Sequence, residues 1–438
     1  MEVKRHISND YVFDIPQEIK VVEHNSRILI ISPETAKWLI ANNKQQLDFF
    51  NLLKASESLG TALAKFQGNI EDAKWIVTQI VAKQFENKDV VRFNSRSLHL
   101  YMTNACNLHC PFCYMDAGKQ EADELSTEEI KTLFSEFKQR GGVIVTLSGG
   151  EATLRKDFCD IVRYAKEIGL KVNVYTNGVL WTKSMIDEIT PFVDKIQISI
   201  DGFNEEENSK IRGKGSFQKS MRTMELFMEN QVPVEIACTP FLDDSLEGKI
   251  NDYVMFGRSL MNKYKGLPFV IKFNGEILDG RDKHFTDEER ERYIQIMEHI
   301  NSQCHNIQSR DDGLIENLKH NEIKDNCAFG SLNVSSTGDI YFCSLIPTLK
   351  AVANIRTDSY EKIFALSEEA KEMSNVDNLK PCCDCELKYI CGGDCRIHHF
   401  DGLKSGIVDK QQAFRKCDMK QKEIFYDMLI RINERLFQ

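Results

Sequence analysis

The sequence has no long hydrophobic run, and this absence argues against a protein with membrane-spanning helices. None of its apolar stretches approaches the roughly 18 residues that a membrane-spanning helix needs. The start of the chain, Met1–Arg5, is polar, and it lacks the apolar region of a secretory signal peptide. We therefore expect a cytoplasmic protein with no membrane partner.

Positive charge is also in short supply. The 56 Lys and Arg residues are outnumbered by 66 Asp and Glu residues, which gives a formal net charge of −10. This balance disfavours general binding to a phosphate backbone, so we expect no nucleic-acid partner. The length of 438 residues favours about two to three domains, and 42% hydrophobic and 28% charged residues are ordinary for a globular protein.

Cysteine, by contrast, is plentiful, with 14 residues. Because the cytoplasm keeps thiols reduced, we interpret these residues as metal ligands rather than disulfides. Cys106, Cys110 and Cys113 follow a strand-like run over 97–102, and three thiolates on one centre leave a coordination position for another ligand. The alternative is three unrelated core cysteines, but chance would give this spacing only roughly 0.01 times in such a chain.

This Cys-x3-Cys-x2-Cys pattern, with the aromatic Phe112 before its last cysteine, resembles the signature of the radical S-adenosylmethionine (SAM) enzymes. The resemblance implies that the three cysteines hold a [4Fe–4S] cluster whose open iron binds SAM. It implies a reducing electron donor such as flavodoxin or ferredoxin, and cleavage of SAM to a 5′-deoxyadenosyl radical that abstracts hydrogen from substrate. It also implies that Phe112 packs near the adenine and that the backbone near Tyr114 contacts the adenine edge.

Residues 94–310 alternate between strand-like and helical patterns, which predicts an α/β fold with a parallel sheet and helices outside it. Ser126 and Glu129 predict a capping box at the start of one of these helices. The resemblance implies a partial (β/α)6 barrel. The predicted strands lie at 97–102, 143–147, 171–175, 195–200, 234–238 and 269–273.

Polar motifs follow several of these strands, where the chemistry of such folds is found. Gly149-Gly150-Glu151 is by itself a weak turn signal, but by resemblance it holds the SAM amino group, although Ala152 replaces the family's usual proline. The next motif contains Thr176 and Asn177, and the one after it contains Ser199 and Asp201. Both motifs are also typical of turns and of strand-to-helix caps. By resemblance they line SAM, and Arg212 pairs with the SAM carboxylate; an exposed loop arginine is the alternative.

The N-terminal residues 1–93 contain no cysteine, no histidine cluster and no phosphate-binding glycine loop. Two β-runs within 18–32, a helix start at Ser32-Pro33-Glu34 and helical patterns over 47–55 and 70–81 predict a winged-helix-like domain. One interpretation is a structural cap, and the other is a module that adds a peptide to a strand edge. The domain loosely resembles the leader-recognition domains of enzymes that modify ribosomally made peptides.

The C-terminal residues 311–438 are rich in cysteine. Zinc is the strongest competing interpretation of their Cys-x2-Cys pairs, but seven of these cysteines resemble the SPASM domain of many radical SAM enzymes. That resemblance implies two auxiliary [4Fe–4S] clusters, one on Cys382, Cys385, Cys391 and Cys417 and the other on Cys327, Cys343 and Cys395. The second set has three cysteines and lacks a fourth ligand. One alternative is that Cys304 or another distant cysteine completes the set. The other alternative is that one iron stays open and binds the thiolate of a substrate. The final stretch, 421–437, predicts an amphipathic helix packed on the barrel.

Together these features predict an enzyme with three [4Fe–4S] clusters that binds a precursor peptide through its leader and installs a crosslink, foremost a thioether from a cysteine sulfur to carbon. A carbon–carbon crosslinking cyclase and a sulfatase-maturase-type enzyme that generates formylglycine are alternatives. A zinc-bearing scaffold and an electron-transfer protein are alternatives from other classes.

Overall fold

The computed structural model describes residues 7–92, 96–304, 310–345, 349–399, 417 and 419–437, and its chain divides into two compact units. The first unit comprises Met1–Asn94, Arg310–Phe329 and Ala370–Gln438, and the second comprises Ser95–Ser309 and Gly330–Glu369. The predicted boundary at residues 93 and 94 lies outside the described residues. No helix among the described residues is long and apolar enough to cross a membrane.

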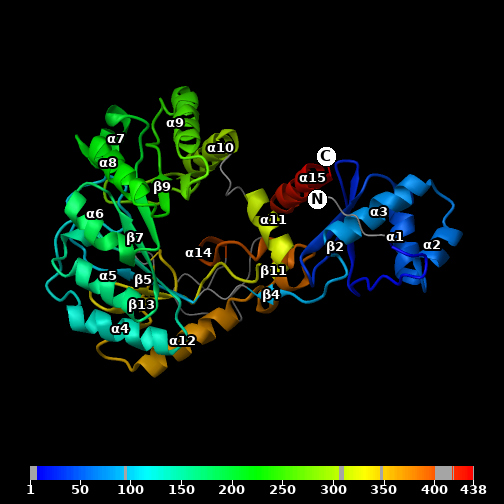
Figure 1. Cartoon of the computed structure of the whole chain (residues 1–438), viewed down its shortest axis with the longest axis horizontal. Helices are drawn as coiled ribbons and strands as arrows, with labels where there is room; N and C mark the ends of the chain where they lie inside the picture. The colour runs from blue at the N-terminus through cyan, green and yellow to red at the C-terminus, as the bar shows by residue number, and fades with distance from the viewer. Residues whose placement is uncertain are drawn as a thin grey trace. The chain divides into compact units, whose positions relative to one another are not determined.

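The second unit is built on a nine-stranded sheet in the order β10-β9-β8-β7-β6-β5-β12-β13-β14. Strands β5 to β10 are all parallel, and their helices alternate with them along the chain, so the predicted α/β fold with a parallel sheet is confirmed. Figure 1 shows these helices outside the strands. The strands are β5 (Ser97–Tyr101), β6 (Ile144–Ser148), β7 (Lys171–Thr176), β8 (Lys195–Ser199), β9 (Val234–Cys238) and β10 (Phe269–Phe273).

The helices of this unit form where the sequence gives clear signals. The predicted capping box is present, since Ser126 and Glu129 each accept from the other's backbone N–H at the start of α4. The buried residues of α4 and α5 face the sheet core, as the period of a helix requires. The helices are α4 (Thr127–Gln139), α5 (Phe158–Glu167), α6 (Lys183–Ile189), α7 (Glu205–Arg212), α8 (Ser216–Glu229), α9 (Ile250–Lys263) and α10 (Asp287–Gln303).

Three short strands extend the sheet beyond β5. Strand β12 (Leu332–Val334) pairs parallel with β5, and β13 (Asp339–Tyr341) and β14 (Ala353–Asn354) follow antiparallel. The helix α12 (Tyr360–Met373) comes next, and its Phe364 stacks on Phe137 of α4 with ring centroids 6.4 Å apart. These elements show that the segment 330–369 is part of the same core as the parallel strands.

The first unit contains an antiparallel sheet in the order β1-β2-β3, from β1 (Lys20–His24), β2 (Arg27–Ser32) and β3 (Lys37–Ala41). The predicted helix start at residues 32–34 is wrong, because a turn leads there into β3. The apolar run from Trp38 to Ala41 is buried on both faces of the sheet, which favours a strand over the short local helix signal. The helices are α1 (Lys44–Ala55), α2 (Leu59–Lys65) and α3 (Ile70–Ala82).

The C-terminal helix α15 (Met419–Phe437) packs on this small sheet, so the prediction that it packs on the barrel is wrong. Its Leu429 and Ile432 lie in one apolar cluster with Leu29 and Trp38, and the Trp38 indole N–H donates to the Leu429 carbonyl at 3.2 Å. Figure 1 shows α15 beside the N-terminal strands. The other elements of this unit are β4 (Val91–Arg92), α11 (Arg310–His320), β11 (Glu322–Ile323), α13 (Lys388–Cys391) and α14 (Arg396–His399).

Candidate functional site

The motifs singled out from the sequence of the second unit lie at one edge of its sheet. The cysteine loop follows β5, Gly149-Gly150-Glu151 follows β6, Thr176-Asn177 ends and follows β7, and Ser199-Ile200-Asp201 ends and follows β8. These four strands are neighbours and parallel, so their carboxyl ends meet at the same edge. The structure thus brings together residues that are far apart in sequence.

The cysteine loop holds its three thiols close enough to affect one another. Cys106, Cys110 and Cys113 are all partly buried, and burial raises the pKa of the Cys106 thiol to about 11, with a further contribution from its two partners. The Leu108 N–H donates to the Cys106 sulfur at 3.5 Å. A bound cation is what would hold such thiols as thiolates, so the donor set suits an iron–sulfur cluster.

No group of three His, Cys, Asp or Glu side chains among the described residues is placed to hold a single metal ion. A four-iron cluster differs from one ion, because each cysteine binds a different iron and the sulfurs need not converge on one point. The triad therefore remains suited to a cluster.

The glycines of the second motif serve close packing against the cysteine loop. Gly149 has a φ of 132°. A Cβ atom added at Gly149 would lie 2.4 Å from the carbonyl oxygen of Thr103. A Cβ atom added at Gly150 would lie 2.2 Å from the carbonyl oxygen of Ala105. The Gly150 N–H donates to the Thr103 carbonyl at 2.8 Å, and the Glu151 N–H donates to the Ala105 carbonyl at the same distance. Only glycine allows this approach, which fixes Glu151 beside the entry to the cysteine loop.

Glu151 is a buried carboxylate, 1% exposed, with no cation beside it among the described residues. One oxygen accepts from the Thr153 hydroxyl at 2.8 Å and the Thr176 hydroxyl at 2.7 Å, and the other accepts from the Asn177 N–H at 2.8 Å. Burial raises its pKa, and these three donors oppose that rise. The second oxygen keeps a free lone pair, which suits an ammonium group.

Asp201 and Arg212 form a buried ion pair, with the guanidinium Nε 2.6 Å from a carboxylate oxygen. The other oxygen of Asp201 accepts from the Thr239 N–H at 2.9 Å. The Arg212 charge also lowers the pKa of the Cys110 thiol against the larger effect of burial, so this pair lies near the cysteine loop. Ser199 lies half-buried at the end of β8 in the same region.

The two aromatic residues of the cysteine loop are held by other rings. Phe112 stacks with Phe241 at a centroid distance of 6.2 Å. The Tyr114 hydroxyl lies 3.4 Å from that of Tyr101, which donates to the Ser344 carbonyl at 2.8 Å. Contacts within the protein therefore hold both side chains in place.

Two contacts within the candidate site were missed by sequence reasoning. Arg281, after β10, bonds to the Ala117 carbonyl and the His109 ring across the cysteine loop. A Cβ on its neighbour Gly280 would lie 2.3 Å from the Phe112 carbonyl carbon, so this segment is pressed against the loop. The second is Asn208, whose side-chain oxygen accepts from the Asp201 N–H at 2.8 Å. A Gly-Arg-Asp sequence shortly after a strand was the available signal for the first.

Four of the C-terminal cysteines predicted as ligands, Cys382, Cys385, Cys391 and Cys417, belong to the first unit. Cys382, Cys385 and Cys391 come from consecutive short turns, and the Leu387 N–H donates to the Cys385 sulfur at 3.4 Å. Cys385 and Cys417 both raise the pKa of Lys422 and that of Tyr426, so they lie near the same residues of α15. Cys385 and Cys417 thus lie near the same part of α15, and the set of four stays a prediction.

The other predicted set is divided between the units, since Cys327 and Cys395 are in the first and Cys343 in the second. This set stays a prediction. Cys304 is 3% exposed and its thiol donates weakly to the Val254 carbonyl at 3.7 Å, beside Gly257 of α9. It therefore packs as a core residue of the second unit.

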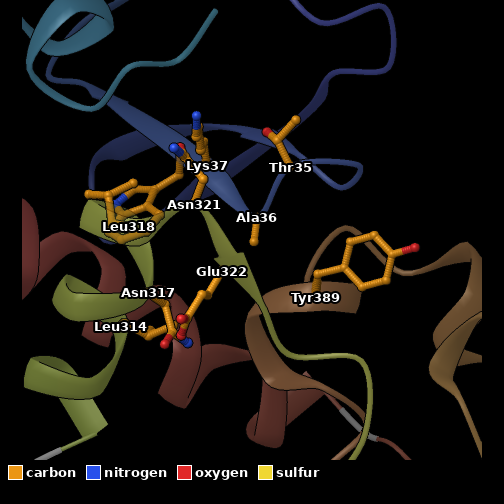
Figure 2. Close-up of a pocket in the computed structure, with 10 residues that line it drawn as sticks. Thr35, Ala36, Lys37, Leu314, Asn317, Leu318, Asn321, Glu322 and Tyr389 are labelled. Carbon is orange, nitrogen blue, oxygen red and sulfur yellow. The ribbon is translucent and has the colours of Figure 1, made fainter. Parts of the chain in front are cut away.

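A small cleft in the first unit contains none of the predicted site residues (Figure 2). Its volume of about 10 Å³ is roughly the space of one water molecule. Two buried polar atoms there, Thr35 Oγ1 and Asn321 Oδ1, have no hydrogen-bond partner among the described residues. Figure 2 shows Leu314, Asn317 and Leu318 of α11 on its wall. The cleft suits a bound water and not a substrate.

Comparison with known proteins finds a family match for the part of the chain that contains the site. Residues 100–248 match the family model described as the Radical SAM superfamily. The chain is similar to the sporulation killing factor maturation protein SkfB of Bacillus subtilis, at 36% identity over 36% of this chain and 38% of SkfB. It is also similar to the subtilosin biosynthesis protein AlbA of Bacillus subtilis, at 27% identity over 71% of this chain and 72% of AlbA.

A solved structure also resembles the chain in fold. Streptococcus suis SuiB, bound to its precursor peptide SuiA, matches 92% of this chain and 99% of SuiB with a TM-score of 0.51 and 15% identity. The family match covers the cysteine triad, Glu151, Asp201 and Arg212. These findings assign residues 100–248 to the Radical SAM superfamily, whose enzymes use SAM and a [4Fe–4S] cluster.

Proposed function

We propose that the chain uses residues 100–248, which match the Radical SAM superfamily, to modify a ribosomally made precursor peptide. The relatives SkfB and AlbA are named for the maturation and biosynthesis of peptide products, and SuiB is a structure with its precursor peptide bound. The proposed product is a crosslink within the peptide, foremost a thioether from a cysteine sulfur to carbon. The observation that carries the proposal is a cation-free buried carboxylate, Glu151, packed beside three clustered thiols.

In this proposal Cys106, Cys110 and Cys113 hold the SAM-binding [4Fe–4S] cluster. When bound, the cluster and SAM supply a 5′-deoxyadenosyl radical that can take hydrogen from an unreactive C–H bond. The Leu108 N–H stabilises negative charge on the Cys106 sulfur, and Arg212 does the same near Cys110. These contacts set the local charge around the three ligands.

Glu151 would accept a hydrogen bond from the SAM ammonium. Thr153, Thr176 and Asn177 already donate to this carboxylate, so they favour its ionised form against burial and fix its direction. Asn177 also donates through its side chain to Asn107 at 2.8 Å, which ties this motif to the cysteine loop. A preformed acceptor of this kind loses little entropy when the ligand binds.

Ser199, Asp201 and Arg212 would line the ribose and amino-acid edge of SAM. Arg212 is fixed by Asp201, which leaves its remaining N–H groups for a ligand carboxylate. Phe112 and the backbone at Tyr114 would flank the adenine. The rings of Phe241 and Tyr101 behind them limit how far these two residues can move.

The C-terminal cysteines would hold two auxiliary clusters. Cys382, Cys385, Cys391 and Cys417 would form one set, which is supported by Cys385 and Cys417 acting on the same two residues of α15. Cys327, Cys343 and Cys395 form the three-cysteine set, whose missing ligand would be supplied by the thiolate of a substrate cysteine. Metal coordination lowers the pKa of a thiol, which would prepare that sulfur for bond formation.

Iron, acid-labile sulfide and zinc analysis of anaerobically purified chain tests this proposal first. About twelve irons with matching sulfide per chain are expected from three four-iron clusters. Zinc without sulfide would instead support a scaffold. A peptide substrate is then sought in the coding region beside the gene, and mass spectrometry of that peptide separates the products: a thioether or a carbon–carbon bond each removes two hydrogens, but only a thioether consumes a cysteine thiol.

A further inference from the structure

The parallel strands of the second unit present two unlike faces. On one face of β7 and β8 the side chains of Val172, Val174, Ile196 and Ile198 are completely buried. The residues that alternate with them are polar, and most of these are only partly buried. Parallel strands usually carry apolar residues on both faces, because both faces are normally covered. The polar face of this sheet is therefore a place where a ligand can meet side chains.

Three residues of the polar face form a row across neighbouring strands. Tyr175 of β7 is in register with Gln197 of β8, and Gln197 is in register with Glu235 of β9. Two residues beyond Tyr175, the Asn177 side chain donates to Asn107 of the cysteine loop at 2.8 Å. Because two residues of a strand span about 7 Å, the row lies just beneath the edge where the motifs of the candidate site meet.

Glu235 has hydrogen-bonding capacity that the described residues do not use. The residue is 9% exposed, and one of its carboxylate oxygens pairs with the Lys195 ammonium group. No hydrogen bond from a described residue reaches its other oxygen. Since nearly all buried polar groups have a partner, an incompletely bonded carboxylate calls for an explanation. Its second oxygen is an acceptor available to a ligand.

Tyr175 offers a second such group beside Glu235. Its ring meets the His99 ring edge to face, with centroids 5.8 Å apart, and His99 stacks on Tyr101 at 4.5 Å. Burial raises the pKa of the Tyr175 phenol, and the nearby Glu235 charge adds to the rise. Within the described part of the chain, the hydroxyl has no hydrogen-bond partner. The ring is thus fixed, and its hydroxyl is available to a ligand near Glu235.

The charges at this row determine which group would fit there. Lys195 already neutralises Glu235, so a second cation would compete with Lys195 for the carboxylate. An anion would be repelled by Glu235. A neutral group that donates to the free oxygen of Glu235 and accepts from the Tyr175 hydroxyl satisfies both residues. Hydroxyl and carboxamide groups have this combination of donor and acceptor.

We infer that Glu235 and Tyr175 hold the residue of the substrate peptide that loses hydrogen, and that they select there a hydroxyl or carboxamide side chain, which is Ser, Thr, Asn or Gln. This inference rests on the proposed peptide-modifying function and names the acceptor residue within it. Two hydrogen bonds from fixed side chains orient the C–H bonds next to the held group. A loosely held residue would be modified less often for each SAM cleaved.

The number of SAM molecules cleaved per peptide modified tests the inference, with the short peptide encoded beside the gene as the probe. Glu235→Gln keeps the side-chain shape and loses the charged acceptor, so this ratio should rise about tenfold. Tyr175→Phe should raise it in the same direction. Glu225→Gln is the matched control, because it loses only surface contacts with Lys263 and Arg222, and its ratio should equal that of the wild type.

A change in the peptide separates direct contact from a structural role of the ion pair. Replacing the modified residue of the peptide by Ala should raise the ratio with the wild-type chain and raise it little further with Glu235→Gln. Lys195→Gln frees the carboxylate from its cation. This variant should therefore gain modification of a peptide that carries Lys at the same position, which the wild-type chain should not modify.

Four results would overturn the inference. Modification of a charged or apolar residue by the wild-type chain would contradict the selected class. Equal ratios for Glu235→Gln and Glu225→Gln would remove Glu235 from the peptide site, and additive effects of Glu235→Gln and the peptide change would make its role structural. These three results leave the proposed function intact. Modification of no peptide by the wild-type chain would contradict the proposed function as well.

Discussion

The Arg212 guanidinium lies 2.6 Å from the Asp201 carboxylate, in a buried position near Cys110. Sequence reasoning assigned both residues to a ligand, and the structure shows that they first bind each other. This pairing holds an arginine in place at the edge of the sheet where the cysteine loop lies. Its consequences can be measured without any cofactor.

Replacing Asp201 by Asn should destabilise the second unit strongly. The variant keeps the shape but leaves the Arg212 charge buried without its partner, which costs about 3–5 kcal/mol of unfolding free energy. Urea unfolding of the apoprotein measures this. The surface variant Arg222→Gln, which loses exposed contacts with Glu225 at 4.0 Å and Glu229 at 3.9 Å, should change stability by less than about 1 kcal/mol. Equal stability of Asp201→Asn and wild type would contradict a buried pair.

Replacing Glu151 by Gln should weaken SAM binding by about 10-fold to 100-fold, since a charge-assisted hydrogen bond becomes a neutral one. Calorimetric titration of reconstituted protein with SAM measures the loss. Thr153→Val is the matched control, because it removes a donor to the carboxylate and keeps its charge. If both variants bound SAM as the wild type does, Glu151 would not contact the ammonium.

Replacing Arg281 by Ala should loosen the cysteine loop. Arg281 bonds across this loop, to the Ala117 carbonyl and the His109 ring, and its loss frees residues 106–118 from the segment after β10. Hydrogen exchange of peptides from that loop should become faster, whereas exchange in β7 should not change. Arg163→Ala, whose side chain pairs with Glu188 on the surface, serves as the control. Unchanged exchange would mean that Arg281 does not clamp the loop.

His99 should make the fold sensitive to mild acid. Burial lowers its pKa to about 4 from 6.5, and its Nε2 lies 2.5 Å from the Ser148 hydroxyl. Between these two pH values the unfolded chain takes up a proton that the folded chain refuses, so the free energy of unfolding falls as pH falls. The contribution at pH 5 is roughly 2 kcal/mol smaller than at pH 7.

The variant His99→Gln cannot titrate, so it isolates this effect from all other groups. Urea unfolding of both proteins at pH 7 and pH 5 should show a smaller loss of stability in the variant. An equal loss in the two proteins would assign the acid sensitivity elsewhere.

The placement of the motifs of the candidate site could be predicted from sequence because of one physical rule. Parallel strands of one sheet end at the same edge, so motifs after β5, β6, β7 and β8 had to meet once those strands were recognised. Glycines 149 and 150 were also recognised, but their role in packing against Thr103 and Ala105 depends on tertiary contacts.

Other features could not be predicted because long-range packing decides them. Residues 37–41 form a strand although Ser32-Pro33 favours a helix start, since two apolar clusters cover both faces of that strand. The same packing joins the N-terminal sheet to α15, through Trp38 and Leu429. Deleting residues 1–93 would therefore expose the apolar face of α15.

Reductive cleavage of SAM tests the central claim most directly. Wild-type chain reconstituted with iron and sulfide, reduced under nitrogen and given SAM, should release 5′-deoxyadenosine. The variant with Cys106, Cys110 and Cys113 all changed to Ala should release none, while it keeps about two thirds of the iron. Undiminished 5′-deoxyadenosine from this variant would contradict the assignment of the triad as the SAM-binding cluster site.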